Sequence, residues 1–302
     1  MTESRNRPRS LVVAAFLSLI LPGFGQLYNG QWNRGLGQFL LFSVSFLGCL
    51  GWLTMNVSPK YTFMVFAATL VLSGLIWVYS TVDALVMARR LREYQEAAWQ
   101  TWPVYVGVFL FAYIAVFNSL IGYTRSNLME PFRIPSASME PNLIRGDFLF
   151  ADKRVNCKGC RRELVHGDVA LFLYPKNRNL VFIKRIVGLP GDRITISGTT
   201  VSRNKQTITT SSEQSGGSIT TSERGRNGQY SVVWQKDSGN QRKFKVPPGH
   251  VFVLGDNRDR SRDSRHYGSV PIQDVIGIAT HVWLSVTGDG GVVWNRLGQQ
   301  IK

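Results

Sequence analysis

The sequence predicts an N-terminal α-helical transmembrane region followed by a mainly β, antiparallel domain. Two observations lead to this fold class. Nearly all long uncharged runs lie before residue 125, whereas later residues form short apolar runs separated by charged and Gly-rich turns. The chain has 302 residues, which is enough for two domains. We therefore expect a membrane anchor at residues 1–125 and a second domain at 126–302.

Three runs in the first region are long enough to cross a bilayer, which takes about 20 apolar residues in a helix. They are approximately Leu36–Val57, Thr62–Thr81 and Pro103–Tyr123, and none contains a charged residue. A shorter run, Leu11–Leu21, is interrupted by Pro22 and Gly23. The small-residue site of a cleaved leader does not follow it, so we expect the segment to be retained.

The distribution of basic residues predicts the topology of this region. Arginines cluster before the first run and between the second and third long spans: Arg5, Arg7, Arg9, Arg89, Arg90 and Arg92. The positive-inside rule then places residues 83–101 in the cytoplasm and directs the last span outward. A re-entrant segment at Leu11–Tyr28 keeps the N-terminus inside, and a full first crossing is the alternative.

The net charge of +16 is unevenly divided. Residues 1–125 contain nine Lys and Arg against four Asp and Glu, giving +5, and residues 126–302 contain twenty-six against fifteen, giving +11. A basic domain tethered to a membrane is attracted to anionic lipid headgroups. Nucleic-acid binding is the rival interpretation, but no helix-turn-helix, RNP-like or zinc-finger pattern accompanies the charge, so we expect no nucleic-acid partner.

The second domain reads as a series of short strands. Predicted strands are Phe148–Ala151, Val169–Tyr174, Leu180–Val187, Arg193–Ser197, Tyr230–Gln235, Lys243–Val246, Val251–Leu254, Ile276–Val286 and Val292–Trp294. Residues 198–242 are rich in Ser, Thr, Gly, Asn and Gln. We interpret them as a polar insertion, either a small β subdomain with mobile loops or a partly disordered segment, and expect no chemistry there.

Two cysteines form a single CxxC motif, Cys157 and Cys160. A zinc ribbon needs a second such pair, which the sequence lacks, so we expect no metal site. On the outer side of a membrane the pair is a possible disulfide, and free structural thiols are the alternative.

The residues most suggestive of chemistry are a serine and a lysine. Ser138 lies in a small-residue loop between two prolines, and Lys184 lies in the apolar run Leu180–Ile186, which predicts a buried strand. Burial disfavours an ammonium ion and lowers its pKa, and a neutral amine can take the proton of a serine hydroxyl. On an alternating strand Arg185 points to the opposite face, and we expect it to supply an outward-facing charge.

Four ordered motifs carry a family resemblance. They are Ser136–Leu143, Arg145–Asp147, Lys184–Asp192 and Gly255–Arg265, following a predicted span. Together they resemble the bacterial type I signal peptidases, which use a Ser–Lys dyad, and the resemblance covers roughly residues 130–300. It implies a signal-peptidase-like catalytic domain on the outer face of the bacterial cytoplasmic (inner) membrane. Its implied partners are the signal peptides of exported preproteins, which the family cuts after small residues in an Ala-x-Ala pattern, with the secretion machinery as a possible further partner.

The resemblance also implies roles for individual residues. Ser138 matches the nucleophile and Lys184 the general base; Ser136 matches an oxyanion-binding hydroxyl, and Ser261 the residue that orients the lysine. Asp263 and Arg265 match a supporting ion pair, and Asp256 a residue that shapes the same wall, although a solvated charged loop is the alternative for these three. Residues matching the walls of the substrate pockets are Ile134, Pro135, Met139, Leu143, Phe182 and Ile183, for which ordinary core packing is equally compatible.

Other interpretations stay open at this stage. The mechanism requires no metal or organic cofactor, and the four histidines are interpreted as structural. A Ser–Lys protease dedicated to one substrate and an inactive, membrane-tethered binding protein are the two alternative functions. Residues Gly23–Gly30 resemble a short G-x-G-Q-x-Y-x-G membrane module, whose small residues favour close helix packing.

Overall fold

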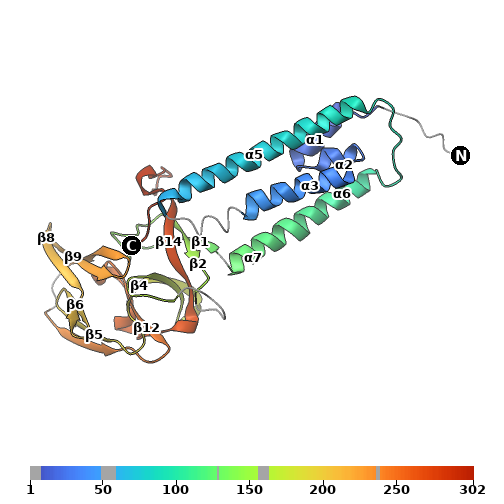
Figure 1. The fold of residues 1–302 in the computed structure, drawn as a ribbon. Coiled ribbons are helices and arrows are strands. Elements are labelled where there is room, and N and C mark those ends of the chain that lie inside the picture. The colour runs from blue at the N-terminus through green and yellow to red at the C-terminus, as the bar shows by residue number, and fades with distance from the viewer. Residues whose placement is uncertain (1–7, 49–58, 128, 156–162, 236–238) are drawn as a thin grey trace. The chain divides into compact units, whose positions relative to one another are not determined.

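The computed structural model describes residues 8–48, 59–127, 129–155, 163–235 and 239–302. The chain forms two compact units, Met1–Arg125 and Ser126–Lys302. The first unit is helical and the second is mainly β (Figure 1). Each unit has its own core of buried apolar side chains.

In the part that the structure describes, the helical unit contains one long helix and several shorter ones. Their bounds are α1 Leu11–Ile20, α2 Phe24–Tyr28, α3 Trp32–Ser43, η1 Val44–Gly48, α5 Pro59–Arg90, α6 Trp102–Phe111, η2 Ala112–Asn118 and α7 Ser119–Asn127, of which η1 and η2 are π-helical. The Ser10 hydroxyl caps α1 by accepting a hydrogen bond from the Val13 N–H. Pro22 and Gly23 follow α1, and Gly23 adopts a φ of +91°, so the chain turns there before α2 begins.

The Gly-rich motif after α1 brings two backbones into contact. A Cβ atom at Gly23 would lie 2.1 Å from the carbonyl oxygen of Gly35 in α3, so only glycine fits. Gln26 is fully buried and donates hydrogen bonds to the Ser80 carbonyl at 2.7 Å and to the Asp83 carboxylate at 3.1 Å. The motif therefore packs against α5 through polar contacts, consistent with a packing role.

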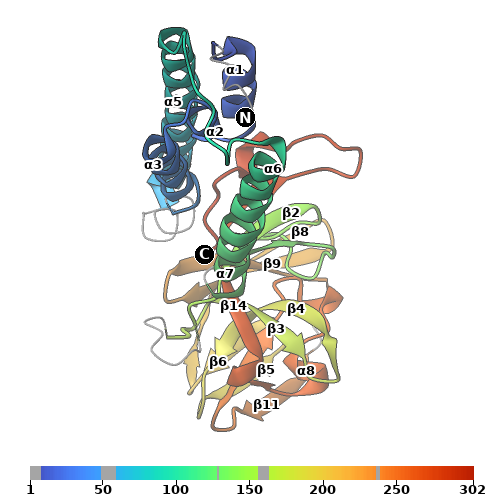
Figure 2. The same cartoon turned by 90° about the vertical axis from the view of Figure 1, so that its right-hand side faces the viewer.

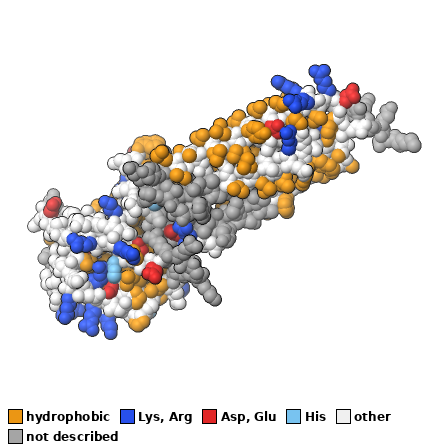
Figure 3. Space-filling view, in the orientation of Figure 1, with side chains coloured by type: hydrophobic (Ala, Val, Ile, Leu, Met, Phe, Trp, Pro, Cys, Tyr) orange, Lys and Arg blue, Asp and Glu red, His pale blue; other side chains and the backbone are white. Residues whose placement is uncertain are grey.

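Among the described residues, one helical stretch is long and apolar enough to cross a membrane. It is Ala67–Arg90, with 24 residues and a mean hydropathy of 1.8, and Figure 3 shows hydrophobic side chains along the helical unit. Three spans were expected, and one helix of the described residues fits that expectation by length and composition. The run Leu36–Val57 lies partly outside the described residues. The run Pro103–Tyr123 is not a uniform α-helix, because it passes through the π-helical η2.

A seven-stranded antiparallel sheet forms the centre of the second unit. Its order is β1 (Met129–Arg133), β2 (Asp147–Asp152), β14 (Val275–Ser285), β3 (Val169–Tyr174), β4 (Asn177–Gly188), β12 (His250–Leu254) and β13 (Val270–Pro271). Figure 2 shows β3, β4 and β14 within this sheet. Strand β4 pairs with β3 along its first part, up to Arg185, and with β12 from Arg185 to Gly188.

Two smaller antiparallel sheets complete the unit. One has the order β11 (Gln241–Lys245), β5 (Arg193–Ser197), β6 (Thr200–Arg203) and β7 (Gln206–Thr207), and the other has the order β10 (Gly228–Trp234), β9 (Ser218–Gly225) and β8 (Thr209–Ser215). The described part of the polar segment 198–242 therefore contains several strands. Short helical turns follow at η3 (Arg258–Arg260), α8 (Ser264–Tyr267), η4 (Ile272–Asp274) and η5 (Trp294–Arg296).

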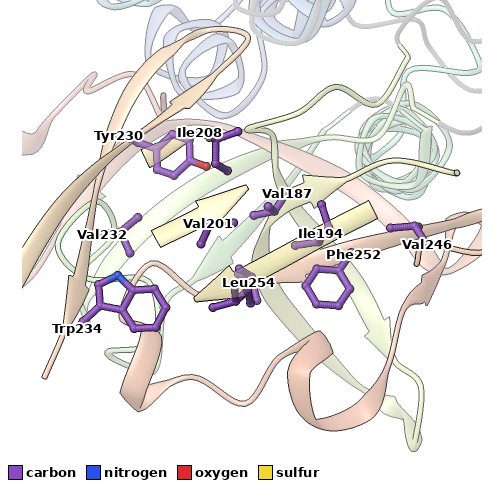
Figure 4. Close-up of a cluster of buried hydrophobic side chains, with 11 residues drawn as sticks. Val187, Ile194, Val201, Ile208, Tyr230, Val232, Trp234, Val246, Phe252 and Leu254 are labelled. Atoms are coloured by element: carbon purple, nitrogen blue, oxygen red, sulfur yellow. The ribbon is translucent and has the colours of Figure 1, made fainter. Parts of the chain in front are cut away.

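The polar insertion shares a core with the central sheet. Tyr230, Val232 and Trp234 alternate along β10 and point into a cluster that also contains Leu254 of β12 and Val187 of β4 (Figure 4). The described part of the insertion is therefore β structure, the first of the two interpretations, and it is packed on the strands that carry the predicted site.

One predicted strand was wrong, and strand β1 was not predicted. Val292–Trp294 forms only an isolated bridge, between Val292 and Val286, followed by a 3₁₀ turn. Strand β1 was missed because it contains Pro131 between charged residues, a composition that argues against a strand. It lies at the edge of the sheet, where a proline is tolerated because no partner needs its N–H.

Candidate active site

Ser138 lies in the loop that joins β1 to β2. The two ends of this loop are tied together, since the Ile134 N–H donates to the Asp147 carbonyl at 2.7 Å and the Gly146 N–H donates to the Ile134 carbonyl at 3.0 Å. Within the loop, the Asn257 N–H donates to the Ser138 carbonyl at 3.2 Å. The Asn257 side chain donates to the Ala137 carbonyl at 3.1 Å. Asn257 thus holds the backbone at Ser138, whose exposure is only 9%.

Lys184 lies in the middle of β4 and points at this loop. Its Nζ is 2.7 Å from the Ser138 Oγ and 2.9 Å from the Ile183 carbonyl oxygen. The side chain is 5% exposed, and its Nζ lies 5.6 Å from the centre of the Phe182 ring. The chain therefore brings an amine and a hydroxyl from segments 46 residues apart into direct hydrogen-bond contact.

The surroundings of Lys184 weaken its hold on a proton. Burial lowers the pKa of Lys184 to about 8, and the nearby charges of Asp263 and Asp256 raise it only in part. A substantial fraction of the amine is consequently neutral at mildly alkaline pH. A neutral amine 2.7 Å from a hydroxyl is positioned to accept its proton.

A second hydroxyl lies beside the Ser138 side chain. The Ser136 Oγ is 3.3 Å from the Ser138 Oγ, and Ser136 is exposed whereas Ser138 is buried. The two serines are separated by one residue, so both side chains lie on the same side of the loop. This places a second hydroxyl within hydrogen-bond distance of the oxygen that would attack a substrate.

The opposite face of β4 carries a fully buried ion pair. Arg185 donates two hydrogen bonds to the Asp256 carboxylate, from Nε at 2.8 Å and from Nη2 at 2.6 Å, and both side chains are essentially inaccessible. The Arg185 guanidinium also lies 3.9 Å from the centre of the Tyr230 ring. The expectation of an outward-facing charge at Arg185 was wrong, because β10 and the loop after β12 cover this face of the sheet.

Much of the loop after β12 is buried as well, although Asp259, Arg260 and Arg262 are exposed. Asp263 forms a two-point ion pair with Arg265, with distances of 2.8 Å from Nε and 2.8 Å from Nη2, and it accepts from the Gly255 N–H at 3.1 Å. Although burial opposes ionisation, these hydrogen bonds lower the pKa of Asp263. The alternative of a solvated charged loop is excluded for Asp256 and Asp263, neither of which is exposed to solvent.

The family profile described as signal peptidase, peptidase S26, matches residues 105–284. The chain belongs to this family. A signal peptidase I of Pseudomonas aeruginosa is 34% identical over 197 residues, which cover 53% of this chain and 66% of that protein. A signal peptidase I of Rickettsia felis is 32% identical over 209 residues, covering 58% of this chain and 77% of the relative. One from Rickettsia massiliae is 30% identical over 224 residues, covering 63% and 81%.

Ser261 is the residue that the resemblance expects to orient Lys184. Ser261 is buried, but among the described residues Lys184 bonds only to the Ser138 hydroxyl and the Ile183 carbonyl, so the contact to Lys184 expected from the resemblance is not made here. Ser261 packs instead on Gly255, where a Cβ atom would lie 2.1 Å from the Ser261 Oγ. Gly255 is therefore glycine because its neighbour occupies the space of a side chain.

The predicted pocket walls divide into a buried and an accessible set. Ile134, Met139 and Leu143 are at most 2% exposed and pack in one core cluster with strands β2, β3 and β14. Ordinary core packing explains them, and they present no surface to a substrate. Pro135 is exposed, and Phe182 and Ile183 are half-buried, so these three remain available as wall residues.

The strand of Lys184 is less buried than its composition predicts. Leu180 and Val181 are 47% and 41% exposed, whereas the residues from Lys184 to Gly188 are buried. Burial begins where β12 pairs with β4, since the register of that pair runs from Leu254 opposite Arg185 to Phe252 opposite Gly188. The apolar composition alone does not reveal where the covering strand starts.

Several contacts of the site were not predicted. Asn257 holds the Ser138 loop, and Asn142 donates to the Asp256 carboxylate at 2.7 Å and to the Ser231 carbonyl at 2.6 Å. Both asparagines lie within the quoted motifs, which was the available signal. Glu223 and Tyr230 lie in the polar insertion, and no sequence feature marks them.

Two further predictions concern possible ligands. Cys157 and Cys160 lie outside the described residues. Among the residues that the structure describes, no group of three or more His, Cys, Asp and Glu side chains is arranged to hold a metal ion. His166 binds Asp192, with 2.7 Å between Nε2 and Oδ2, which ties the turn before β3 to the turn before β5.

Proposed function

We propose that the chain is a membrane-bound serine endopeptidase that removes N-terminal signal peptides from exported preproteins. The observation that carries the proposal is the 2.7 Å contact between the Lys184 Nζ and the Ser138 Oγ, both buried. Membership of the signal peptidase family supplies the substrate class. The lowered pKa of Lys184 supports its role as the base.

The first half of the reaction is acyl transfer to Ser138. Lys184 takes the proton of the Ser138 hydroxyl as its Oγ attacks the scissile carbonyl carbon. The resulting oxyanion receives hydrogen bonds from the Ser136 hydroxyl and the Ser138 N–H, which stabilise charge where it develops. The Lys184 ammonium then gives its proton to the leaving amine as the C–N bond breaks, leaving an ester on Ser138.

The second half releases the acyl group. Lys184, neutral again, takes a proton from a water molecule that attacks the ester carbonyl. When the C–O bond breaks, the Ser138 oxygen regains a proton from Lys184, and the signal peptide leaves with a free carboxylate. One buried amine thus serves both steps because it is returned to the neutral form after each.

Cleavage after small residues is proposed as the specificity. Pro135, Phe182 and Ile183 are the accessible apolar residues next to the dyad, and they are suited to shallow pockets that exclude long side chains. The buried set, Ile134, Met139 and Leu143, supports the walls from behind.

The helical unit is proposed as the anchor in the bacterial inner membrane, with the catalytic domain on the outer side. Along α5, one face exposes Val71, Leu75, Val78, Val82 and Val86. Such a continuous apolar stripe is unfavourable in water and suited to lipid. Arg89 and Arg90 end the helix, as expected for a cytoplasmic boundary.

Cleavage of a preprotein with an Ala-x-Ala site by the detergent-solubilised full chain tests the proposal. We expect the wild type to cut at that site, and Ser138→Ala and Lys184→Ala to be inactive while retaining the wild-type fold. An inactive wild type, or near-normal cleavage by either variant, would refute the mechanism. Cleavage of one preprotein among several would instead favour a protease dedicated to a single substrate.

A further inference from the structure

Glu223 of the polar insertion forms a buried ion pair with Arg258, which lies in the loop after β12. The Arg258 Nη2 donates to the Glu223 Oε2 at 2.7 Å, and both side chains are completely buried. Tyr230 lies directly opposite Glu223 in the β9–β10 ladder, and its hydroxyl donates to the same carboxylate oxygen at 3.1 Å. The Arg258 guanidinium lies 5.0 Å from the centre of the Trp234 ring, on the same face of β10.

Arg258 also bonds to the Gly255–Asn257 segment, which holds the Ser138 loop. Its Nε donates to the Gly255 carbonyl at 3.1 Å. Gly255 in turn touches the Ser138 loop, since a Cβ atom there would lie 2.6 Å from the Ser138 carbonyl oxygen. Asn257, next to Arg258, donates to that same oxygen.

The same hairpin also touches the strand of the base. Tyr230 stacks on Arg185, the residue after Lys184, at 3.9 Å. The Val233 N–H donates to the Asp256 carbonyl at 2.8 Å, and Asp256 holds Arg185 through its side chain. Strands β9 and β10 therefore contact the supports of both Ser138 and Lys184, although neither strand carries a residue of the dyad.

We infer that Glu223 is a positioning residue for catalysis, acting through Arg258 on the Gly255–Asn257 segment that fixes the Ser138 loop. The inference rests on the function proposed above. A buried arginine that keeps its guanidinium against one carboxylate cannot shift without breaking its bond to the Gly255 carbonyl. Displacing reacting groups by about 1 Å can reduce turnover about 10²-fold, so a small relaxation of this segment is sufficient to lower the rate.

Loss of the Glu223–Arg258 pair is expected to affect kcat and not KM. Glu223 and Arg258 are buried, and their side chains bond to each other, to Tyr230 and to Gly255, and not to the accessible wall residues Pro135, Phe182 and Ile183. Loss of the pair should therefore lower kcat and leave KM nearly unchanged. A contribution to overall stability alone would lower the amount of folded enzyme without altering the kcat of the molecules that remain folded.

The decisive experiment compares full-length variants in detergent by kcat, KM and Tm on a preprotein with an Ala-x-Ala site. Replacing a buried ion pair by apolar residues of similar size often preserves stability, so the double variant Glu223→Leu, Arg258→Met is expected to fold. It lacks the hydrogen bond to the Gly255 carbonyl. We expect its kcat to fall at least about tenfold with KM within about twofold of the wild type.

Two single variants and a control complete the test. Glu223→Gln keeps the shape and removes the charge, and it decides the question if the double variant does not fold. Glu223→Asp keeps the charge, so it should recover part of the kcat lost in Glu223→Gln. Arg224→Gln removes a charge from the exposed face of the same strand and should leave kcat and KM as in the wild type.

Wild-type kcat in a folded Glu223→Gln variant or in the folded double variant would overturn the inference. So would equal losses in kcat for Arg224→Gln and Glu223→Gln. An inactive wild type would instead overturn the proposed function, and the inference with it. The two failures are distinguishable because only the second affects the unmodified chain.

Discussion

Lys184 and Arg185 are neighbouring buried cations on one strand, and the two faces of β4 treat them in opposite ways. Lys184 faces the Ser138 loop with a hydroxyl and a carbonyl as its hydrogen-bond partners. Arg185 faces the insertion and meets the Asp256 carboxylate through two hydrogen bonds. Burial lowers the pKa of Lys184; burial also opposes the charge of Arg185, but Asp256, with Tyr230 and Glu223, raises its pKa.

The difference shows how one strand can carry both a base and a structural charge. A buried cation without a carboxylate in direct contact gives up its proton readily, and a buried cation with a two-point partner stays charged. Guanidinium suits the second task because it does not deprotonate in proteins, and ammonium suits the first because its pKa responds to burial. The hydrogen-bond partner on each face therefore decides which of the two residues can act as a base.

The largest expected effect is the loss of kcat when Lys184 is replaced by arginine, which places the same residue type on both faces of β4. Lys184→Arg keeps a buried cation but cannot supply a neutral base, so kcat should fall about 10⁴-fold or more. Preprotein cleavage by the folded full-length variant measures it. Retention of more than a tenth of the wild-type kcat would show that Lys184 is not the base.

Breaking the pair on the other face should cost stability. Asp256→Ala leaves Arg185 buried without its counter-ion, which we expect to reduce the free energy of unfolding by about 3–5 kcal/mol. Thermal unfolding of the full chain in detergent gives the change in Tm. Arg260→Ala, at an exposed position in the same charged run, is the control and should change stability by less than about 0.5 kcal/mol.

Replacing Ser136 tests whether its hydroxyl stabilises the oxyanion on the Lys184 side of β4. Ser136→Ala removes a hydroxyl 3.3 Å from the Ser138 Oγ, and kcat should fall about 10²–10³-fold with a small change in KM. Ser211→Ala, on the exposed strand β8, should have no effect. A Ser136→Ala enzyme with wild-type kcat would remove this hydroxyl from the oxyanion site.

Lys184 should also destabilise the fold near neutral pH. Its pKa is about 8 when folded and ordinarily 10.5, so the folded chain binds fewer protons than the unfolded chain between these values. The penalty is complete below pH 8 and disappears as the pH rises through 10.5, with an upper limit of about 3 kcal/mol. Lys184→Met should therefore raise Tm at pH 7.

The pH dependence of that gain checks the interpretation. The increase in Tm for Lys184→Met should shrink between pH 8 and pH 10.5, because the wild type loses its penalty over this range. Loss of the hydrogen bonds to Ser138 and Ile183 offsets part of the gain. A difference in Tm that does not change between pH 8 and pH 10.5 would show that burial does not lower the pKa of Lys184.

The smallest expected effect is the dependence of the wild-type kcat/KM on pH. Because only neutral Lys184 acts as the base, kcat/KM should rise about tenfold per pH unit below pH 8 and level off above it. The slope of log kcat/KM against pH measures it. A flat profile between pH 6 and pH 8 would contradict the lowered pKa.

The sequence alone determined a good part of this protein. Short apolar runs bounded by Gly, Pro and Asp predicted most strands of the central sheet, including β3 and β5 at their observed bounds. A serine between prolines and a lysine in an apolar run predicted the pair that the structure brings to 2.7 Å. These features are local, because turn residues and alternation act within a few positions of the chain.

Only the tertiary structure decided what covers each face. Alternation places Arg185 opposite Lys184, but it does not reveal that Asp256 and Tyr230 lie over Arg185 and bury it. Glu223 lies in a polar segment of weak pattern, and its role depends on Arg258, which is 35 positions away. The physical reason is that burial and pKa depend on which distant segment supplies the partner, and that choice is made when the whole domain packs.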